Sequence, residues 1–340
     1  MRKKYPAGKL PPDVLDRLLA RIPARDPRLL VGPRFGEDAA VIDMGDRYLV
    51  AKSDPITFTT EHLGWYAVNI NANDVAAMGA RPRWFLAVLL LPERHTDRRL
   101  VESIFQDVVA ACRELSITLC GGHTEITTGL DRPILVGHLL GEAGKKELVR
   151  KTRLRVGDAL LLTKGIAIEG TAILAREKAA ELRRHFSAAF LKRARDFIYR
   201  PGISVVREAL TAARTADVHA MHDPTEGGLA GGLLELAAAG DVGLRVWADR
   251  ISILPETRAL ASHLGFDPMA LIASGALLIG VAARDARKLV ATLKRRKIAS
   301  EIIGEVLPKK FGTRMVENGR EKKVRYPRQD EIARLLASAP

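Results

Sequence analysis

The chain has 340 residues, enough for two domains, and its 47% hydrophobic and 28% charged residues are typical of a globular protein rather than a disordered chain. No uncharged apolar run is long enough to span a membrane, and no apolar stretch follows the basic N-terminus as in a secretory signal. We therefore predict a cytoplasmic protein with no membrane partner.

The net charge of +14 invites a nucleic-acid interpretation, but only 5% of the residues are aromatic and the basic clusters lack interleaved stacking residues. We therefore expect a solvated, arginine-rich surface and no nucleic-acid partner. Residues 36–142 differ from the rest, because they contain 15 acidic and 9 basic residues, a net charge of −6. The remainder of the chain carries +20.

Helices and strands alternate along the first half, which predicts a mixed α/β domain. The predicted helices cover 12–22, 61–79 and 97–115. A glycine-rich loop is predicted to lead into a short strand within the segment GPRFGEDAAVID at 32–43. Further strands are predicted at 48–54, 84–91 and 133–141, with a short strand that ends at Cys120 and a glycine loop at 121–129. The charged segment 142–157 is typical of a domain boundary.

The second half shows the same alternation. Its predicted strands lie at 159–164, 243–248, 276–282 and 298–306, and its helices at 168–214, 226–239, 255–263 and 284–296. The last 30 residues are interpreted as a basic linker and a short helix. The predicted organisation is an N-terminal helical extension (1–35), two domains (36–150 and 151–310) and a basic tail (311–340).

One carboxylate interrupts an apolar helix face. At helical spacing, Asp74 falls at the centre of a face formed by residues such as Leu63, Ile70 and Met78. A carboxylate there costs several kcal/mol unless it is paired or metal-bound. The two interpretations are a metal ligand and a capped or salt-bridged structural aspartate, for which Arg81 and Arg83 lie near enough in sequence to pair.

Three further aspartates, Asp38, Asp54 and Asp223, occur where predicted strands meet loops. Each alone is typical of a turn or a cap. As a set on separate loops, their hard oxygen ligands suit Mg²⁺, which also binds phosphate oxygens.

Two glycine pairs accompany these aspartates. In the DPTEGG segment, Thr225 can cap the following helix, and Gly227 and Gly228 can bring a phosphate to its N-terminus, or else serve packing alone. Gly121 and Gly122 precede His123, Thr124 and Glu125, where the histidine can be a ligand, a base or a turn residue. Neither a Walker-type phosphate loop nor a dinucleotide fingerprint is present in the sequence.

In this order, the segments GEDAAVID, SD at 53–54, NDVAAMGARP, GGHTEIT and HDPTEGGL resemble the aminoimidazole ribonucleotide (AIR) synthetase superfamily over residues 36–306. That superfamily includes HypE-type hydrogenase-maturation proteins, selenophosphate synthetase and thiamine-phosphate kinase. The chain is most similar to the HypE-like members. The resemblance implies a two-domain α/β (α+β) fold, in which an N-terminal α/β domain dimerises, a C-terminal α+β domain follows, and ATP lies in the cleft between them.

The resemblance also implies an ATP- and Mg²⁺-dependent enzyme that phosphorylates an oxygen of an amide- or carbamoyl-like substrate, either a small molecule or protein-borne. It implies a homodimer, with a hydrogenase-maturation protein as a further partner. The implied metal ligands are Asp38, Asp54, Asp74 and Asp223. The implied nucleotide contacts add Asn73, Gly121, Gly122, Thr225, Gly227 and Gly228 to these four.

The chain departs from the family pattern at three places. His123 stands where a carboxylate is usual, so Glu125 is expected to supply it, and these two residues are the catalytic candidates. His222 and Glu226 stand where HypE-type proteins have arginine around the loop. The sequence ends in Ala339-Pro340 without the cysteine that carries the carbamoyl group in HypE. The alternative expectation is therefore a non-catalytic ATP-binding accessory protein of metalloenzyme maturation.

Overall fold

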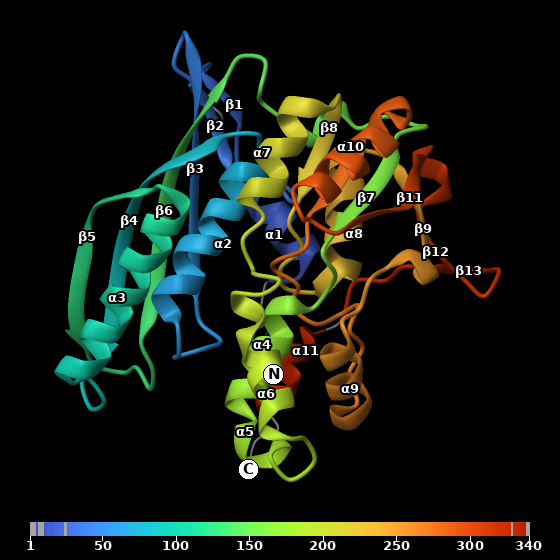
Figure 1. Ribbon diagram of the computed structural model, residues 1–340. Helices are drawn as coiled ribbons and strands as arrows, with labels where there is room; N and C mark the ends of the chain where they lie inside the picture. The colour runs from blue at the N-terminus through green and yellow to red at the C-terminus, as the bar shows by residue number, and fades with distance from the viewer. Residues whose placement is uncertain (1–4, 6–9, 24–25, 328, 338–340) are drawn as a thin grey trace, which may run out of the picture. The chain divides into compact units, whose positions relative to one another are not determined.

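The computed structural model describes residues 5, 10–23, 26–327 and 329–337. The chain forms two compact units (Figure 1). The N-terminal unit contains Ala24–Gly32 and Asp38–Leu148, and the C-terminal unit contains Met1–Pro23, Pro33–Glu37 and Val149–Pro340. The helix predicted at 12–22 is α1 (Pro12–Leu19), in the C-terminal unit.

A six-stranded sheet forms the centre of the N-terminal unit. Its strands, in spatial order, are β1 (Leu29–Val31), β2 (Ala40–Asp43), β3 (Arg47–Ile56), β6 (Ile134–Gly144), β4 (Arg81–Pro92) and β5 (Thr118–Thr127). Only β4 and β5 run parallel. Helices α2 (Leu63–Ala77) and α3 (Arg98–Leu115) lie side by side on one face of this sheet (Figure 1). The alternation predicted for this half is confirmed.

Helix α2 is buried along its whole length, from Leu63 to Ala77. It contacts the sheet on one side and α3 on another, and a Cβ atom on Gly64 would lie only 2.5 Å from the backbone oxygen of Ile104 in α3. The prediction of a single apolar face was therefore wrong, because this helix has no solvent-facing side. Asp74 consequently lies in the interior.

The prediction of a glycine loop at 121–129 was also wrong for most of its length. β5 continues through both glycines to Thr127, and it forms an exposed edge of the sheet. A Cβ atom on Gly122 would lie 1.9 Å from the backbone oxygen of Ala87 in β4. The glycine here allows close strand pairing instead of forming a ligand loop.

A seven-stranded sheet forms the centre of the C-terminal unit. Its strands, in spatial order, are β13 (Arg320–Lys323), β12 (Thr313–Glu317), β9 (Gly243–Trp247), β11 (Ser300–Leu307), β7 (Ala159–Thr163), β10 (Leu278–Val281) and β8 (Val218–His222). The four strands predicted in this half are confirmed. The linker predicted beyond 310 was wrong, because β12 and β13 form a hairpin and β12 pairs with β9 in parallel.

The core of this unit lies between the sheet and α8 (Gly228–Gly240), where Leu160 and Leu162 of β7 meet Leu229 and Leu233. Helices α7 (Val206–Thr215) and α10 (Ala283–Arg295) contact each other and the strands β7, β8 and β11. The remaining helices are α4 (Ile168–Glu177), α5 (Ala179–Leu182), α6 (Ala188–Arg195), α9 (Pro255–Leu264) and α11 (Glu331–Ala337). The α/β (α+β) class predicted from the sequence is confirmed.

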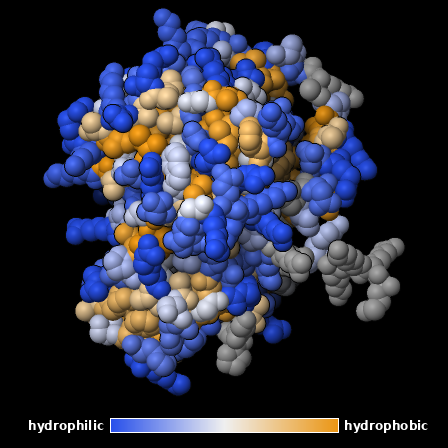
Figure 2. Space-filling view, turned by 90° about the vertical axis from the view of Figure 1, so that its right-hand side faces the viewer, coloured by the Kyte–Doolittle hydropathy of each residue, from blue (hydrophilic) through white to orange (hydrophobic). Residues whose placement is uncertain are grey.

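Hydrophilic side chains dominate the face of the C-terminal unit shown in Figure 2. Basic residues of its sheet are in ion pairs, such as Lys322 of β13 with Glu317 of β12, and Arg245 of β9 with both Glu305 and Glu321. This pairing supports the expectation of a solvated arginine-rich surface. Among the described residues, every helix is too short or too polar to cross a membrane.

Candidate functional site

Three of the four predicted metal ligands lie in one cluster of the N-terminal unit, around a lysine that the sequence analysis did not consider. The Lys52 Nζ atom lies 2.9 Å from Oδ2 of Asp74 and 3.4 Å from Oδ2 of Asp54. Asp38 is buried and close enough to influence both Lys52 and Asp74 electrostatically. We call these four residues the acidic cluster.

The local structure explains how the sequence builds this cluster. β3 continues past Asp54 to Ile56, so Lys52 and Asp54 are two residues apart in a strand and point to the same side. Asn71 of α2 donates from Nδ2 to the backbone oxygens of Asp54, at 3.3 Å, and Ala67, at 2.8 Å. This amide ties the strand to the helix one turn before Asp74.

Burial and like charge act together on Asp74. Burial raises its pKa to about 6; the ammonium of Lys52 opposes this rise, and the carboxylates of Asp38 and Asp54 add to it. Burial alone would lower the pKa of Lys52, but the three carboxylates outweigh burial and raise it. Lys52 is therefore an ammonium ion, and the neighbouring carboxylates favour an additional cation.

The donor set of the acidic cluster fits a hard divalent cation. Three carboxylates and one ammonium carry a formal charge of −2, and carboxylate oxygens are the protein ligands that Mg²⁺ prefers. Asn73 is fully buried on α2 beside Asp74. Asp74 is also in a salt bridge, as the alternative interpretation expected, but its partner is Lys52, whereas Arg83 pairs with Glu142.

The fourth predicted ligand, Asp223, belongs to the C-terminal unit, where it directly follows β8 and is buried. The helix after it begins differently from the prediction. Gly227, and not Thr225, is the N-cap of α8, and its N–H donates to the carboxylate of Asp330 at 2.5 Å. A side chain of the tail thus accepts a hydrogen bond from an N–H group that was predicted to bind phosphate.

Packing accounts for the other glycine of this loop. Gly228 has a φ angle of +62°, and a Cβ atom on it would lie 2.5 Å from the backbone oxygen of Met269. The N–H of Gly228 donates to Thr225 O, and that of Ala230 to Met269 O. Of the two interpretations of these glycines, the structure supports close packing, so we do not retain Gly227 and Gly228 as a phosphate cradle.

His222 has partners at both ring nitrogens, in Lys151 and Glu235 of the C-terminal unit. It is therefore a buried interior residue, unlike the arginine expected from the family pattern. Lys151 and Glu235, which contact His222, and Tyr326, which contacts Glu235, were missed because they are far apart in the sequence and form no motif.

The two catalytic candidates lie elsewhere in the N-terminal unit. His123 Nε2 and Glu125 Oε2 are 3.3 Å apart on exposed β5. In the sheet order, β5 is three strands away from β3, a distance of about 14 Å at ordinary strand spacing. The structure therefore does not bring His123 and Glu125 to the acidic cluster of the same unit. Of the two cysteines, Cys112 is buried and Cys120 is exposed on β5.

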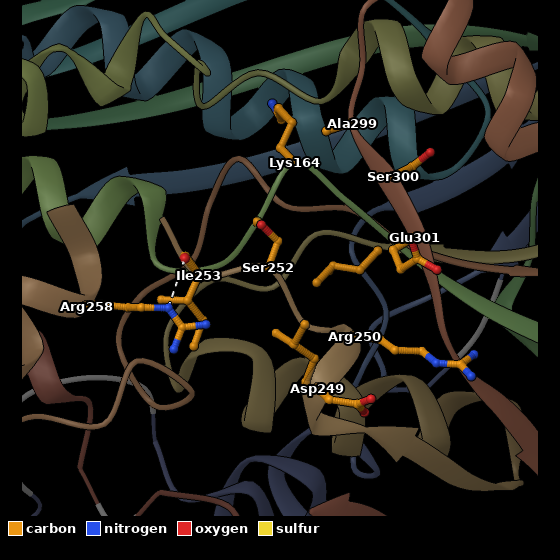
Figure 3. Close-up of a pocket in the computed structure, with 12 residues that line it drawn as sticks. Lys164, Asp249, Arg250, Ser252, Ile253, Arg258, Ala299, Ser300 and Glu301 are labelled. Atoms are coloured by element: carbon orange, nitrogen blue, oxygen red, sulfur yellow. Dashed lines mark hydrogen bonds between the residues drawn. The ribbon is translucent and has the colours of Figure 1, made fainter. Parts of the chain in front are cut away.

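The C-terminal unit also contains a cavity of about 520 Å³ between the end of β7, the start of β11 and the segment before α9 (Figure 3). Arg250, Arg258, Asp249 and Glu301 line it. Lys164 turns its ammonium away from both arginines (Figure 3) and donates to the backbone oxygens of residues 202 and 204. None of the predicted site residues lines this cavity.

Models of known protein families match most of the chain. The N-terminal domain of the AIR synthase related proteins matches residues 36–143, and the C-terminal domain of the same family matches residues 155–317. The chain belongs to the AIR synthase related proteins. The resemblance inferred from the five sequence segments is thereby confirmed.

Relatives of this AIR synthase related protein have different activities in their names. It is 27% identical over 283 residues to a hydrogenase expression/formation protein of Methanocaldococcus jannaschii, covering 81% of this chain and 80% of the relative. It is 32% identical over 266 residues to the selenide, water dikinase of Rhizobium meliloti, covering 75% of this chain and 71% of that relative. A crystal structure of the hydrogenase maturation protein HypE in complex with ATP shares the fold, with a TM-score of 0.72 at 22% identity over 94% of this chain and 91% of that one.

Proposed function

We propose that this AIR synthase related protein is an ATP- and Mg²⁺-dependent enzyme that transfers a phosphoryl group to an oxygen of an amide- or carbamoyl-like substrate. The observation that carries the proposal is the acidic cluster, in which three aspartates and one lysine leave a formal charge of −2 within the N-terminal unit. The names of the relatives support it, because a selenide, water dikinase and an ATP-complexed HypE share its family or fold.

In this proposal Asp38, Asp54 and Asp74 hold Mg²⁺, and Asp223 of the C-terminal unit is a further contact. Bound magnesium would supply charge neutralisation for the triphosphate, which is the main requirement of phosphoryl transfer. The chain's own residues bind and orient the nucleotide, and Lys52 keeps the three carboxylates in place through its contacts with Asp74 and Asp54. The reaction then depends chiefly on positioning and electrostatics.

Calorimetry with ATP in the presence and absence of MgCl₂ tests this proposal directly. We expect ATP to bind only with Mg²⁺, because the cluster repels a triphosphate that brings no cation. ATP turnover is then measured against a panel of carbamoyl and amide compounds, with release of ADP as the signal. Equal affinity with and without MgCl₂ would refute the magnesium site.

The second candidate is a non-catalytic ATP-binding protein that docks on a hydrogenase-maturation partner. The name of the M. jannaschii relative, a hydrogenase expression/formation protein, is the observation that favours it. Mg²⁺-dependent ATP binding without ADP release, for any compound of the panel or in the presence of maturation proteins, would support this candidate over the enzyme.

We also propose a homodimer that uses the exposed face of β5 and α3. Leu119 and Ile126 on β5 and Phe105 and Val109 on α3 are exposed, Ile126 by 57%, and a cavity of about 420 Å³ lies between the two elements. Large exposed apolar patches of this kind mark protein interfaces. Continuity with the free edge of β5 favours a second copy of the chain as the occupant.

Sedimentation at micromolar concentration is therefore expected to give a dimer, and Ile126→Glu a monomer. Val156→Glu is the matched control, since Val156 is 58% exposed in the C-terminal unit. A monomeric wild type, or a dimer that survives Ile126→Glu, would reject this interface.

A further inference from the structure

A chain of four polar side chains, three of them buried and one half-buried, runs through the C-terminal unit. Lys151 Nζ lies 2.9 Å from His222 Nδ1, His222 Nε2 lies 3.0 Å from Glu235 Oε2, and Tyr326 OH lies 3.2 Å from Glu235 Oε1. Lys151, His222 and Glu235 are each at most 5% exposed. We call these four residues the relay.

The chemistry of the groups fixes the direction of each hydrogen bond. An ammonium group can only donate, so Nδ1 of His222 must accept from Lys151. The proton of a neutral imidazole then lies on Nε2, which donates to Glu235, and the hydroxyl of Tyr326 donates to the other carboxylate oxygen. The lysine and the glutamate balance each other in charge, so the relay is compatible with deep burial.

The relay holds the backbone next to two predicted ligands. Lys151 Nζ also donates to the backbone oxygen of Gly36, at 2.5 Å, and Asp38 follows Gly36 by two residues. Gly36 packs against α8, because a Cβ atom on it would lie 2.7 Å from the backbone oxygen of Glu235. At the other side of Lys151, His222 directly precedes Asp223.

The tail completes the relay from a distant part of the sequence. The Tyr326 ring packs against Gly227, where a Cβ atom would lie 3.5 Å from it, and Asp330 accepts from the N–H groups of Gly227 and Ile332. Two separate links thus join the tail to the segment that carries Asp223. Leucine side chains would fill this space without needing hydrogen-bond partners, so packing alone does not explain these polar groups.

We propose that Lys151, His222, Glu235 and Tyr326 are positioning residues that orient Asp223 and the segment leading to Asp38 for Mg-ATP. This inference rests on the proposed function of the same site. Some side chains contact a metal ligand without binding the metal themselves, and replacing them commonly lowers the metal affinity about 10–100-fold. We describe the four as positioning residues because the contacts given above join them to one another and to Gly36 within the C-terminal unit.

The test measures how much MgCl₂ is needed for half-maximal ATP binding, at a fixed saturating concentration of ATP, in the full-length protein. We expect His222→Leu to raise this midpoint about tenfold. His222→Asn keeps an acceptor for Lys151, and His222→Gln keeps a donor for Glu235. Each should therefore raise the midpoint less than His222→Leu does. Tyr326→Phe keeps the ring contact and removes one hydrogen bond, so it should give the smallest shift.

His219→Leu is the matched control. His219 is also buried on β8, and its Nδ1 lies 2.8 Å from Asp158, outside the relay. Both leucine variants should lose stability in thermal unfolding, but only His222→Leu should shift the magnesium midpoint. An unshifted midpoint in a folded His222→Leu protein, or an equal shift in His219→Leu, would overturn the relay. A wild type without Mg²⁺-dependent ATP binding would instead refute the proposed function.

Discussion

Asp74→Asn is expected to abolish Mg²⁺-dependent ATP binding and to leave the protein at least as stable as the wild type. The aspartate lies in the interior of α2, and burial raises its pKa to about 6, so its ionised form is destabilised in the folded protein at neutral pH. Asparagine removes that cost together with a metal ligand, while Lys52 retains Asp54 as a partner.

The sign of the pH dependence follows from the direction of the shift. A carboxyl group whose pKa is raised on folding binds its proton more tightly in the folded protein than in the unfolded chain. Asp74 therefore adds to the free energy of unfolding at low pH, and this contribution is lost as the pH rises through about 6. Without Mg²⁺, the free energy of unfolding should therefore decline between pH 4 and pH 6 less steeply in Asp74→Asn than in the wild type.

Calorimetry with Mg-ATP and urea unfolding measure the two effects. Asp46→Asn serves as the control, because Asp46 is an exposed aspartate of the same unit, paired with Arg47. It should match the wild type in both measurements. Wild-type affinity for Mg-ATP in folded Asp74→Asn would contradict the assignment of the metal site.

Lys52→Met should be the most destabilising single change at the site when Mg²⁺ is absent. It leaves Asp38, Asp54 and Asp74 together without their ammonium partner. Removing one member of a buried ion pair commonly costs about 3–5 kcal/mol, because an uncompensated charge stays behind. The loss should shrink in millimolar MgCl₂ and at pH 4–5, where a cation or protons replace the ammonium.

Urea unfolding of a double-mutant cycle checks this expectation. Lys52→Met combined with Asp74→Asn should be more stable than Lys52→Met alone, since one of the three carboxylates is gone. Lys145→Met is the control for loss of a surface pair with Asp43, which contributes at most about 1 kcal/mol. A Lys52→Met protein as stable as Lys145→Met, with no response to MgCl₂, would show that the carboxylates do not interact as described.

The sequence predicted the order of most helices and strands because the alternation of apolar residues follows the strand and helix periods over long segments. It also predicted Asp38, Asp54 and Asp74 as a set, and the structure places them around one ammonium. Lys52 was missed although the predicted strand 48–54 already contains both Lys52 and Asp54. Residues two apart in a strand point to the same side, and this alternation was the available signal.

The predictions that were wrong or missing share a physical cause: the local composition of a segment does not reveal which other segments it contacts. Gly122 suggested a loop, whereas the backbone of β4 approaches so closely that a strand requires glycine there. Thr225 suggested a helix cap, but Asp330, more than a hundred residues away, accepts from the N-cap N–H. The relay was invisible for the same reason, since its four members come from η1 (Lys151–Arg153), β8, α8 and the tail.

The ammonium of Lys52 has a consequence for the order of events during synthesis of the protein. All parts of the acidic cluster lie before residue 75, whereas Asp223 and the tail that supports its loop come much later in the chain. Ribosomes add about 5–20 residues per second, so the residues up to 148 are synthesised several seconds before Asp223. During that interval Lys52 acts as a resident cation for the three carboxylates, so the nascent unit needs no captured metal to bury them.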